Sequence, residues 1–184
     1  MSSGHFPDQE PRCNTPFFLP RPVRGVVELM RLTGMRPGEA RTSRGYELDM
    51  SNEVWIYTPA IHKTVHRWRI KEIPVGPKAQ TLLIDYLVDD PDQYLFRPIN
   101  MRKSGGRIRG IMYGKDALRR AIERVCKRTG IELFSPNQIR HAFAADIRKQ
   151  IGLDACRSML GHTNTRTTEI YAERDRAMSC DIAL

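Results

Sequence analysis

The sequence has few cysteines, and none of them are close enough together to indicate a zinc module. Cys13, Cys126, Cys156 and Cys180 are widely scattered, and no CxxC pair occurs. Structural zinc sites and the disulfide frameworks of small secreted domains both depend on regularly spaced cysteines. We therefore expect reduced cysteines, with no metal site and no disulfide framework.

Long apolar runs are also missing. No run reaches the roughly 18 apolar residues that a membrane-spanning helix requires, and the N-terminus has no apolar core of the kind found in signal peptides. The sequence therefore predicts a cytoplasmic protein.

Acidic residues are too few to balance the basic ones. The 184 residues include 30 lysines and arginines but 21 aspartates and glutamates, which gives a formal net charge of +9 and an isoelectric point of about 9.7. This charge suits a polyanion such as nucleic acid or an acidic membrane surface, and a merely basic surface is the alternative. The length and the 40% hydrophobic content fit one sizeable globular domain.

A nucleotide-binding loop is not predicted. Residues 110–115 have the wrong spacing for GxxxxGK[ST], and no Ser or Thr follows Lys115. The basic stretch 97–115 instead fits a flexible loop that follows a phosphate backbone. His62 and His66 are four residues apart, but their segment does not look helical and no third ligand is evident, so a metal pair is not predicted either.

Apolar residues at helical spacing predict helices over residues 23–30, 79–87 and 118–125. Gly34 and Gly130 follow the first and the third stripe, as glycines commonly do at helix C-termini. The other sides of the third helix carry basic residues, namely Arg119, Arg120, Arg124, Lys127 and Arg128. This basic face fits a position near DNA, with an ordinary solvated face as the alternative.

Two stretches rich in β-branched and aromatic residues, 53–57 and 67–75, predict two antiparallel strands. Residues 60–66 would connect them, so Lys63 lies on or beside the connection. The predicted fold class is therefore α+β and mainly α-helical, with a small antiparallel β-sheet or hairpin.

A further helix is predicted to begin after Ser135. Ser135 is a good N-cap, Pro136 suits the first helical position, and Gln138 stands where a capping box needs it. Ile139, Phe143 and Ile147 repeat at helical spacing and are expected to face a core.

A different face of this helix is polar, because Asn137 and Arg140 are three residues apart. His141 points about 100° away from Arg140, and we interpret it as a buried packing or hydrogen-bonding residue. Gly152 is expected to end the helix. A short helix over 154–160, a bend at His162 and a last helix that carries Tyr171 are predicted to follow.

These residues resemble the C-terminal boxes of the tyrosine recombinases, the phage-integrase family. The boxes are RH at 140–141, LGH at 160–162, and TT at 167–168 before Tyr171. Upstream, LTGMRPGEA resembles the first arginine box, with Arg36 as its arginine and Glu39 as its acidic companion. Lys63 in HKT, followed by a basic strand and IPV, resembles the family's hairpin lysine. The matches follow the family's order from about residue 22 to residue 175.

The resemblance implies site-specific DNA recombination, in which DNA strands are cleaved and rejoined through a 3′-phosphotyrosyl intermediate. Tyr171 would be the nucleophile, and Arg36 and Arg140 would bind the nonbridging phosphate oxygens. His162 would donate to the same oxygens or orient the phosphate, and Lys63 would protonate the leaving 5′-oxygen. Double-stranded DNA is the implied partner, with self-association on DNA and with no cofactor, metal or membrane.

One position departs from the family, which usually has His where this chain has Asn137. An amide can donate a hydrogen bond but cannot act as a base, so slower cleavage is expected. Glu39 is expected to hold the Arg36 guanidinium by a charge-assisted hydrogen bond, and a surface ion pair is the alternative.

The predicted domain organisation has three parts: a tail or linker remnant at 1–20, a catalytic domain at 21–175 and a C-terminal tail at 176–184. The 20 tail residues cannot replace the family's usual N-terminal DNA-clamping domain, so we expect a truncated chain. The resemblance implies that the tail after Tyr171 docks on a neighbouring protomer, and a frayed tail is the alternative. The alternative function is a non-catalytic DNA-binding protein or degenerate integrase fragment. A type IB topoisomerase shares the chemistry, but the short chain and its LGH box fit an integrase better.

Overall fold

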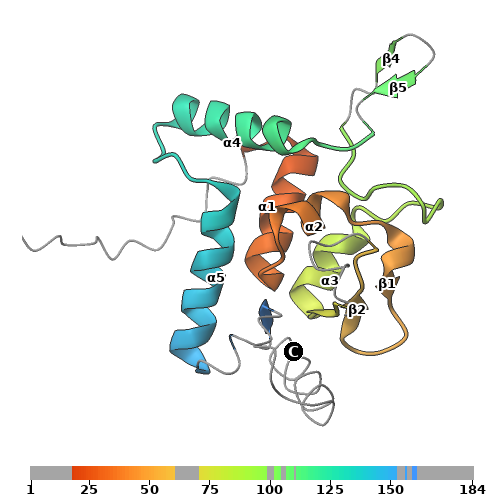
Figure 1. Cartoon of the computed structure of the whole chain (residues 1–184), viewed down its shortest axis with the longest axis vertical. Helices are drawn as coiled ribbons and strands as arrows, with labels where there is room; N and C mark the ends of the chain where they lie inside the picture. Colours follow the sequence, from red (N-terminus) through yellow and green to blue (C-terminus); the bar gives the residue numbers. More distant parts are fainter. Residues whose placement is uncertain are drawn as a thin grey trace, which may run out of the picture.

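A computed structural model of the chain describes residues 18–60, 71–98, 102–104, 107–109, 111–152, 156, 159 and 160. Helices predominate in this part of the chain, and α1 (Arg21–Thr33) lies at its centre (Figure 1). Around α1, and in contact with it, are α2 (Pro37–Thr42), α3 (Pro77–Ile84), α4 (Lys115–Thr129) and α5 (Pro136–Gln150).

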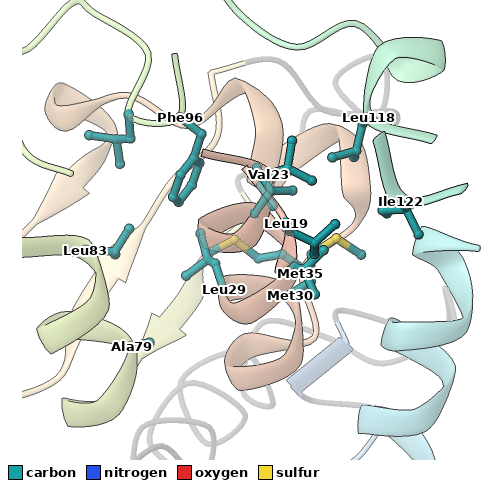
Figure 2. Packing of buried hydrophobic residues seen from close by; sticks show 14 of the residues in the cluster. Leu19, Val23, Leu29, Met30, Met35, Ala79, Leu83, Phe96, Leu118 and Ile122 are labelled. Carbon is teal, nitrogen blue, oxygen red and sulfur yellow. The ribbon is translucent and has the colours of Figure 1, made fainter. Parts of the chain in front are cut away.

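The central position of α1 follows from its apolar stripe. Val23, Val26 and Met30 are fully buried, and they pack against side chains from α3, α4 and the segment that follows α3 (Figure 2). Each such buried side chain contributes roughly 1.5–3 kcal/mol. The helix ends as predicted at Gly34, which has a positive φ of 66° and donates its N–H to the carbonyl of Met30 at 2.9 Å.

A three-stranded antiparallel sheet has the strand order β1-β2-β3, and its strand β3 contacts α1. The strands are β1 (Leu48–Asp49), β2 (Trp55–Tyr57) and β3 (Ile73–Val75), and Ile56 is paired with Pro74. Both strands expected from the sequence are therefore confirmed, although residues 67–70 of the second lie outside the described part. β1 was not predicted, because two residues are too few to show an alternating pattern. It follows a 3-10 helix, η2 (Gly45–Glu47).

The prediction of a flexible loop over 97–115 is wrong for seven of its residues, since six lie in strands and Lys115 begins α4. β4 (Arg102–Ser104) and β5 (Arg107–Arg109) form an antiparallel two-stranded ribbon that projects from the helices (Figure 1). Two glycines, residues 105 and 106, separate the strands in the sequence, and such a pair is a common hairpin signal. The sequence-based prediction of a loop followed the strongly basic composition of the stretch instead of this glycine pair.

The helices after this ribbon begin and end close to where the sequence predicted. α4 ends before Gly130, whose φ is 68°, and α5 begins after the N-cap Ser135, whose N–H donates to the side chain of Gln138. On α5, Phe143 belongs to a second small core, against which Ile147 packs. The other buried members of that core are Cys156, Met159 and Leu160. Within the described ranges, no helix combines the length and apolar character that crossing a bilayer requires.

Candidate active site

Arg36 is positioned by the sharp turn between α1 and α2. The left-handed conformation of Gly34 ends α1, and Arg36 follows as the N-cap of α2 with extended backbone angles of −69° and 149°. Its Nη1 donates to Oε1 of Glu39 at 3.1 Å, and its backbone N–H donates to Oε2 of Glu39 at 2.9 Å. The Arg36 side chain remains 35% exposed. The guanidinium is therefore held from one side and accessible from another.

Glu39 is the buried anion of this site. Its side chain is 4% exposed, so the alternative of a surface ion pair with Arg36 is wrong. A second cation, the Lys71 ammonium, lies 2.6 Å from Oε1. Burial alone would raise the pKa of the Glu39 carboxyl, but the charge of Lys71 and the hydrogen bonds from Lys71 and Arg36 together lower that pKa below its ordinary value. Glu39 is therefore ionised at neutral pH.

Arg140 is positioned by backbone carbonyls. It is 9% exposed on α5, and its guanidinium donates to the carbonyl of Gly34 and, at 2.8 Å, to the carbonyl of Leu160. Burial, followed by the positive charge of Arg36, lowers the pKa of the Arg140 guanidinium. Two acceptors from different segments thus orient its planar fork.

The end of α1 is the point at which the two arginines meet. The Gly34 carbonyl accepts from Arg140, Arg36 is two residues further along the chain, and the positive charges of the two arginines repel each other. A side chain at Gly34 would be strained, because φ is positive and an added Cβ would overlap the ring of Phe143 unless that ring moved. A shared glycine therefore sets the relative position of two residues that are distant in the sequence.

Two other polar residues of α5 that the sequence singled out are more exposed than Arg140. Asn137, in the first turn of the helix, has an exposed side chain, whereas Arg140 on the same face is buried. His141 is also exposed, so the prediction of a buried histidine is wrong. The apolar side of α5, with Phe143, packs inward, and the angle between neighbouring helical residues turns His141 towards solvent.

Three predicted site residues, Lys63, His162 and Tyr171, lie outside the described residues, as do the predicted last helix and the bend before it. Their assignments remain predictions. In the described part, Arg140 nevertheless contacts the carbonyl of Leu160, the first residue of the LGH box that contains His162.

Sequence reasoning missed three polar side chains that support the site. Lys71 binds Glu39, and Tyr57, which is 1% exposed, donates its hydroxyl to the Glu39 carbonyl at 3.2 Å or to Oε2 of Glu47 at 3.3 Å. Burial, with the charge of Glu47, raises the pKa of Tyr57, so the phenol stays neutral. No sequence spacing links these residues, since they come from separate segments and their pairing depends on the tertiary fold.

Comparison with known proteins gives the same family. A model of the phage integrase family matches residues 13–178. The chain is 27% identical over 160 residues to the tyrosine recombinase XerC of Bacillus pumilus, an alignment that covers 80% of this chain and 48% of that protein. It is 28% identical over 155 residues to XerD of Staphylococcus aureus, which covers 80% and 48%. The chain thus spans about half the length of the curated relatives it matches.

Solved structures agree at the level of the fold. The Tn1549 transposon integrase, in complex with circular intermediate DNA, superposes with a TM-score of 0.60 at 16% identity, covering 92% of this chain and 68% of that one. The XerH recombinase bound to its difH substrate has a TM-score of 0.56 at 16% identity, covering 85% and 46%. These likenesses confirm the predicted α+β, mainly helical class. Because the family model covers nearly the whole sequence, the chain belongs to the phage integrase family.

Proposed function

We propose that this chain carries the catalytic domain of a tyrosine-type site-specific recombinase, which cleaves and rejoins double-stranded DNA. The observation that carries the proposal is the convergence of Arg36 and Arg140 at the end of α1, each held by separate acceptors. Two oriented guanidinium groups suit a phosphodiester, because their planar forks match phosphate oxygens and neutralise charge that grows in the transition state. Membership of the phage integrase family supports the same reading.

The proposed reaction exchanges one phosphoester bond for another. The phenolic oxygen of Tyr171 attacks phosphorus, the bond from phosphorus to the 5′-oxygen breaks, and a 3′-phosphotyrosyl link forms. The phenol loses its proton to a base, and Lys63 supplies a proton to the leaving 5′-oxygen. A DNA 5′-hydroxyl later reverses these steps and releases the tyrosine, so no external energy source is required. His162 is assigned a hydrogen bond to the phosphate.

The proposal also covers the extent of the domain and its surroundings. We assign the catalytic domain to residues 21–175 and the tails to 1–20 and 176–184. Structural neighbours in complex with DNA support double-stranded DNA as the partner. Exchange of strands between two sites needs more than one active centre, so self-association on DNA belongs to the proposal, without a nucleotide cofactor. Cleavage and rejoining of DNA also fit the predicted cytoplasmic location.

A trapping experiment tests the function. Nicked duplexes are prepared from the DNA that flanks the coding sequence, so that cleavage beside the nick releases a short strand and leaves the protein attached. The full chain should form an adduct that survives denaturant. Tyr171→Phe should bind the same duplexes with similar affinity and form no adduct, because it lacks the nucleophilic oxygen. An adduct with the Phe variant would make another residue the nucleophile.

A second candidate, a DNA-binding protein that does not cut, is favoured by one observation, namely Asn137 in place of the family's usual His. Under this reading the chain binds duplex DNA with a strong salt dependence, since its basic surface releases counterions, with a log–log slope of about −0.9 per phosphate contact. Salt-dependent binding, together with the absence of an adduct on every nicked duplex, would favour the non-cutting DNA-binding protein. A flat affinity between low and physiological salt would argue against both.

A further inference from the structure

The single negative charge of Glu39 is in contact with two positively charged side chains. Its Oε1 accepts both from Nη1 of Arg36 at 3.1 Å and from Nζ of Lys71 at 2.6 Å, while Oε2 accepts the Arg36 backbone N–H at 2.9 Å. One buried carboxylate therefore serves two cations. The shorter and more buried of the two ion pairs is the one with Lys71, whose side chain is 10% exposed against 35% for Arg36.

This arrangement decides how much positive charge Arg36 presents to the solvent side. With Lys71 charged, the group of Arg36, Glu39 and Lys71 has a net charge of +1, because Lys71 neutralises the carboxylate. Without Lys71, the Glu39 charge is opposed by Arg36 alone, and the group is neutral. At an effective dielectric constant of about 20, one unit charge roughly 6–12 Å away changes the stabilisation of a transition-state phosphate by on the order of 10- to 100-fold in rate.

Lys71 also marks one end of the segment that contains Lys63. It is the first described residue after positions 61–70, and Ala60 is the last described residue before them. The Ala60 N–H donates to Oε1 of the buried Glu47 at 2.8 Å. The Tyr57 hydroxyl lies within hydrogen-bonding distance of both carboxylate-bearing residues, through Oε2 of Glu47 and the Glu39 carbonyl. Ala60 and Lys71, which flank positions 61–70 in the sequence, thus both join the hydrogen-bond network around Glu39 and Glu47.

We propose that Lys71 is a positioning residue: by neutralising Glu39 it leaves the charge of Arg36 available to a DNA phosphate. This proposal rests on the proposed function for the identity of the anion. It assigns Lys71 no contact with DNA, because its ammonium is already engaged inside the protein.

The role of Lys71 depends on its charge and hence on pH. Burial lowers the pKa of Lys71 to about 8, the attraction of Glu39 opposes this shift, and the positive charges of Arg36 and Arg140 add to it. The Tyr57 phenol stays neutral through this range. The ammonium is therefore present below about pH 8 and is lost above it, at which point Glu39 would compensate Arg36.

Three variants of the full chain separate this role from a structural one. Lys71→Met removes the charge, Lys71→Arg retains it at every pH, and Lys78→Met removes the charge of an exposed lysine on α3 as the matched control. On a nicked duplex that the wild type cuts, Lys71→Met should lower the single-turnover cleavage rate about 10- to 100-fold at pH 7. Lys71→Arg should recover most of this loss, and Lys78→Met should behave as wild type. The duplex affinity of Lys71→Met should stay within a few fold of wild type.

The pH profile gives a readout that a merely structural residue would not change. The rate of the wild type relative to Lys71→Arg should fall as pH rises through about 8, because only the lysine loses its proton. This comparison remains decisive if Lys71→Met does not fold. A constant ratio from pH 6 to 9, or a wild-type cleavage rate in Lys71→Met, would overturn the proposal. So would a fall in duplex affinity as large as the fall in rate, which would make Lys71 a DNA contact.

A measurement without DNA keeps the test independent of the proposed function. The Arg36 backbone N–H and guanidinium both bind Glu39, so their NMR resonances should shift with a midpoint near pH 8 in the wild type and not in Lys71→Arg. If no duplex is cut, the proposed function fails, while this titration still decides the role of Lys71. Arg36 resonances that do not respond in the wild type would contradict the coupling.

Discussion

The two arginines of the site are held in different ways. Arg36, on the turn between α1 and α2, is paired with a carboxylate and is 35% exposed. Arg140, on α5, is paired with two neutral carbonyls and is 9% exposed. The Glu39 carboxylate offsets the charge of Arg36 unless another cation opposes it, whereas the carbonyl dipoles of Gly34 and Leu160 orient the Arg140 guanidinium. We infer that Arg140 is specified by geometry and Arg36 by charge balance.

Charge-conserving substitutions should give the largest contrast between the two arginines. Arg140→Lys keeps the charge, but one ammonium cannot reproduce the planar fork that spans the carbonyls of Gly34 and Leu160. Its cleavage rate should fall by about 10³-fold, as expected when an oriented transition-state donor is lost. Arg36→Lys keeps a cation beside Glu39 and should lose about ten times less activity. Single-turnover rates on one nicked duplex give both numbers, and equal losses would remove the distinction.

Two glycines that end helices test the claim that geometry specifies the position of Arg140. Gly34 and Gly130 both end helices with φ close to 67°, at 66° and 68°, but only at Gly34 would a Cβ meet another residue, the Phe143 ring. Gly130→Ala should cost about 1 kcal/mol of unfolding free energy from backbone strain. Gly34→Ala should cost about 2–4 kcal/mol, since overpacking is added to the same strain. Urea unfolding of both variants measures the difference, and equal costs would mean that the Phe143 contact is relaxed without penalty.

The sequence predicts the contacts of the two arginines to different extents. Local signals were sufficient for the helices: the apolar stripe of α1, Gly34 at its end, and the Ser135 N-cap of α5 are each encoded within a few residues. The Arg36–Glu39 pair was likewise predicted, because the two residues are three apart.

Contacts between distant segments carried no such signal. The Lys71–Glu39 pair and the carbonyls that receive Arg140 depend on how α1, α5 and β3 pack together. The exposure of His141 was mispredicted for the same reason, since the direction of a helical face is fixed by its tertiary partners. The two-residue strand β1 was too short for any periodicity to reveal.

Removal of the Glu39 carboxylate tests whether charge balance specifies the Arg36 site. Glu39→Gln keeps the shape of the side chain but leaves the buried Lys71 without a counter-charge, and it should cost about 1–3 kcal/mol of unfolding free energy at neutral pH. The pKa of Glu39 is lowered in the folded protein, so its stabilising contribution is present above the unfolded value of 4.5 and is lost as pH falls through the lowered pKa. The difference from wild type in denaturant unfolding should therefore shrink on acidification below pH 4.5. A difference that stays constant down to pH 3 would contradict the ion pair.

The smallest effect is expected at Asn137, which is exposed at the start of α5 and is held by neither type of contact described for the arginines. Asn137→His should preserve or raise the cleavage rate, most visibly below about pH 8, where little tyrosinate forms unaided. If the amide has its own role as a donor, the substitution should slow cleavage, because neutral imidazole has a single N–H. Single-turnover rates from pH 6 to 9 distinguish these outcomes, and a large loss at every pH would contradict the interpretation of Asn137 as a missing base.

The central claim is that Arg36 and Arg140 neutralise the same scissile phosphate, and replacing that phosphate tests it most directly. A nicked duplex with a neutral methylphosphonate at the cleavage position carries no charge for the arginines to offset. We predict that Arg36→Ala and Arg140→Ala each reduce the rate of covalent attachment to the phosphate duplex by at least about 10²- to 10³-fold, and to the methylphosphonate duplex by far less. Equal losses on the two duplexes would show that neither arginine acts through the charge of that phosphate.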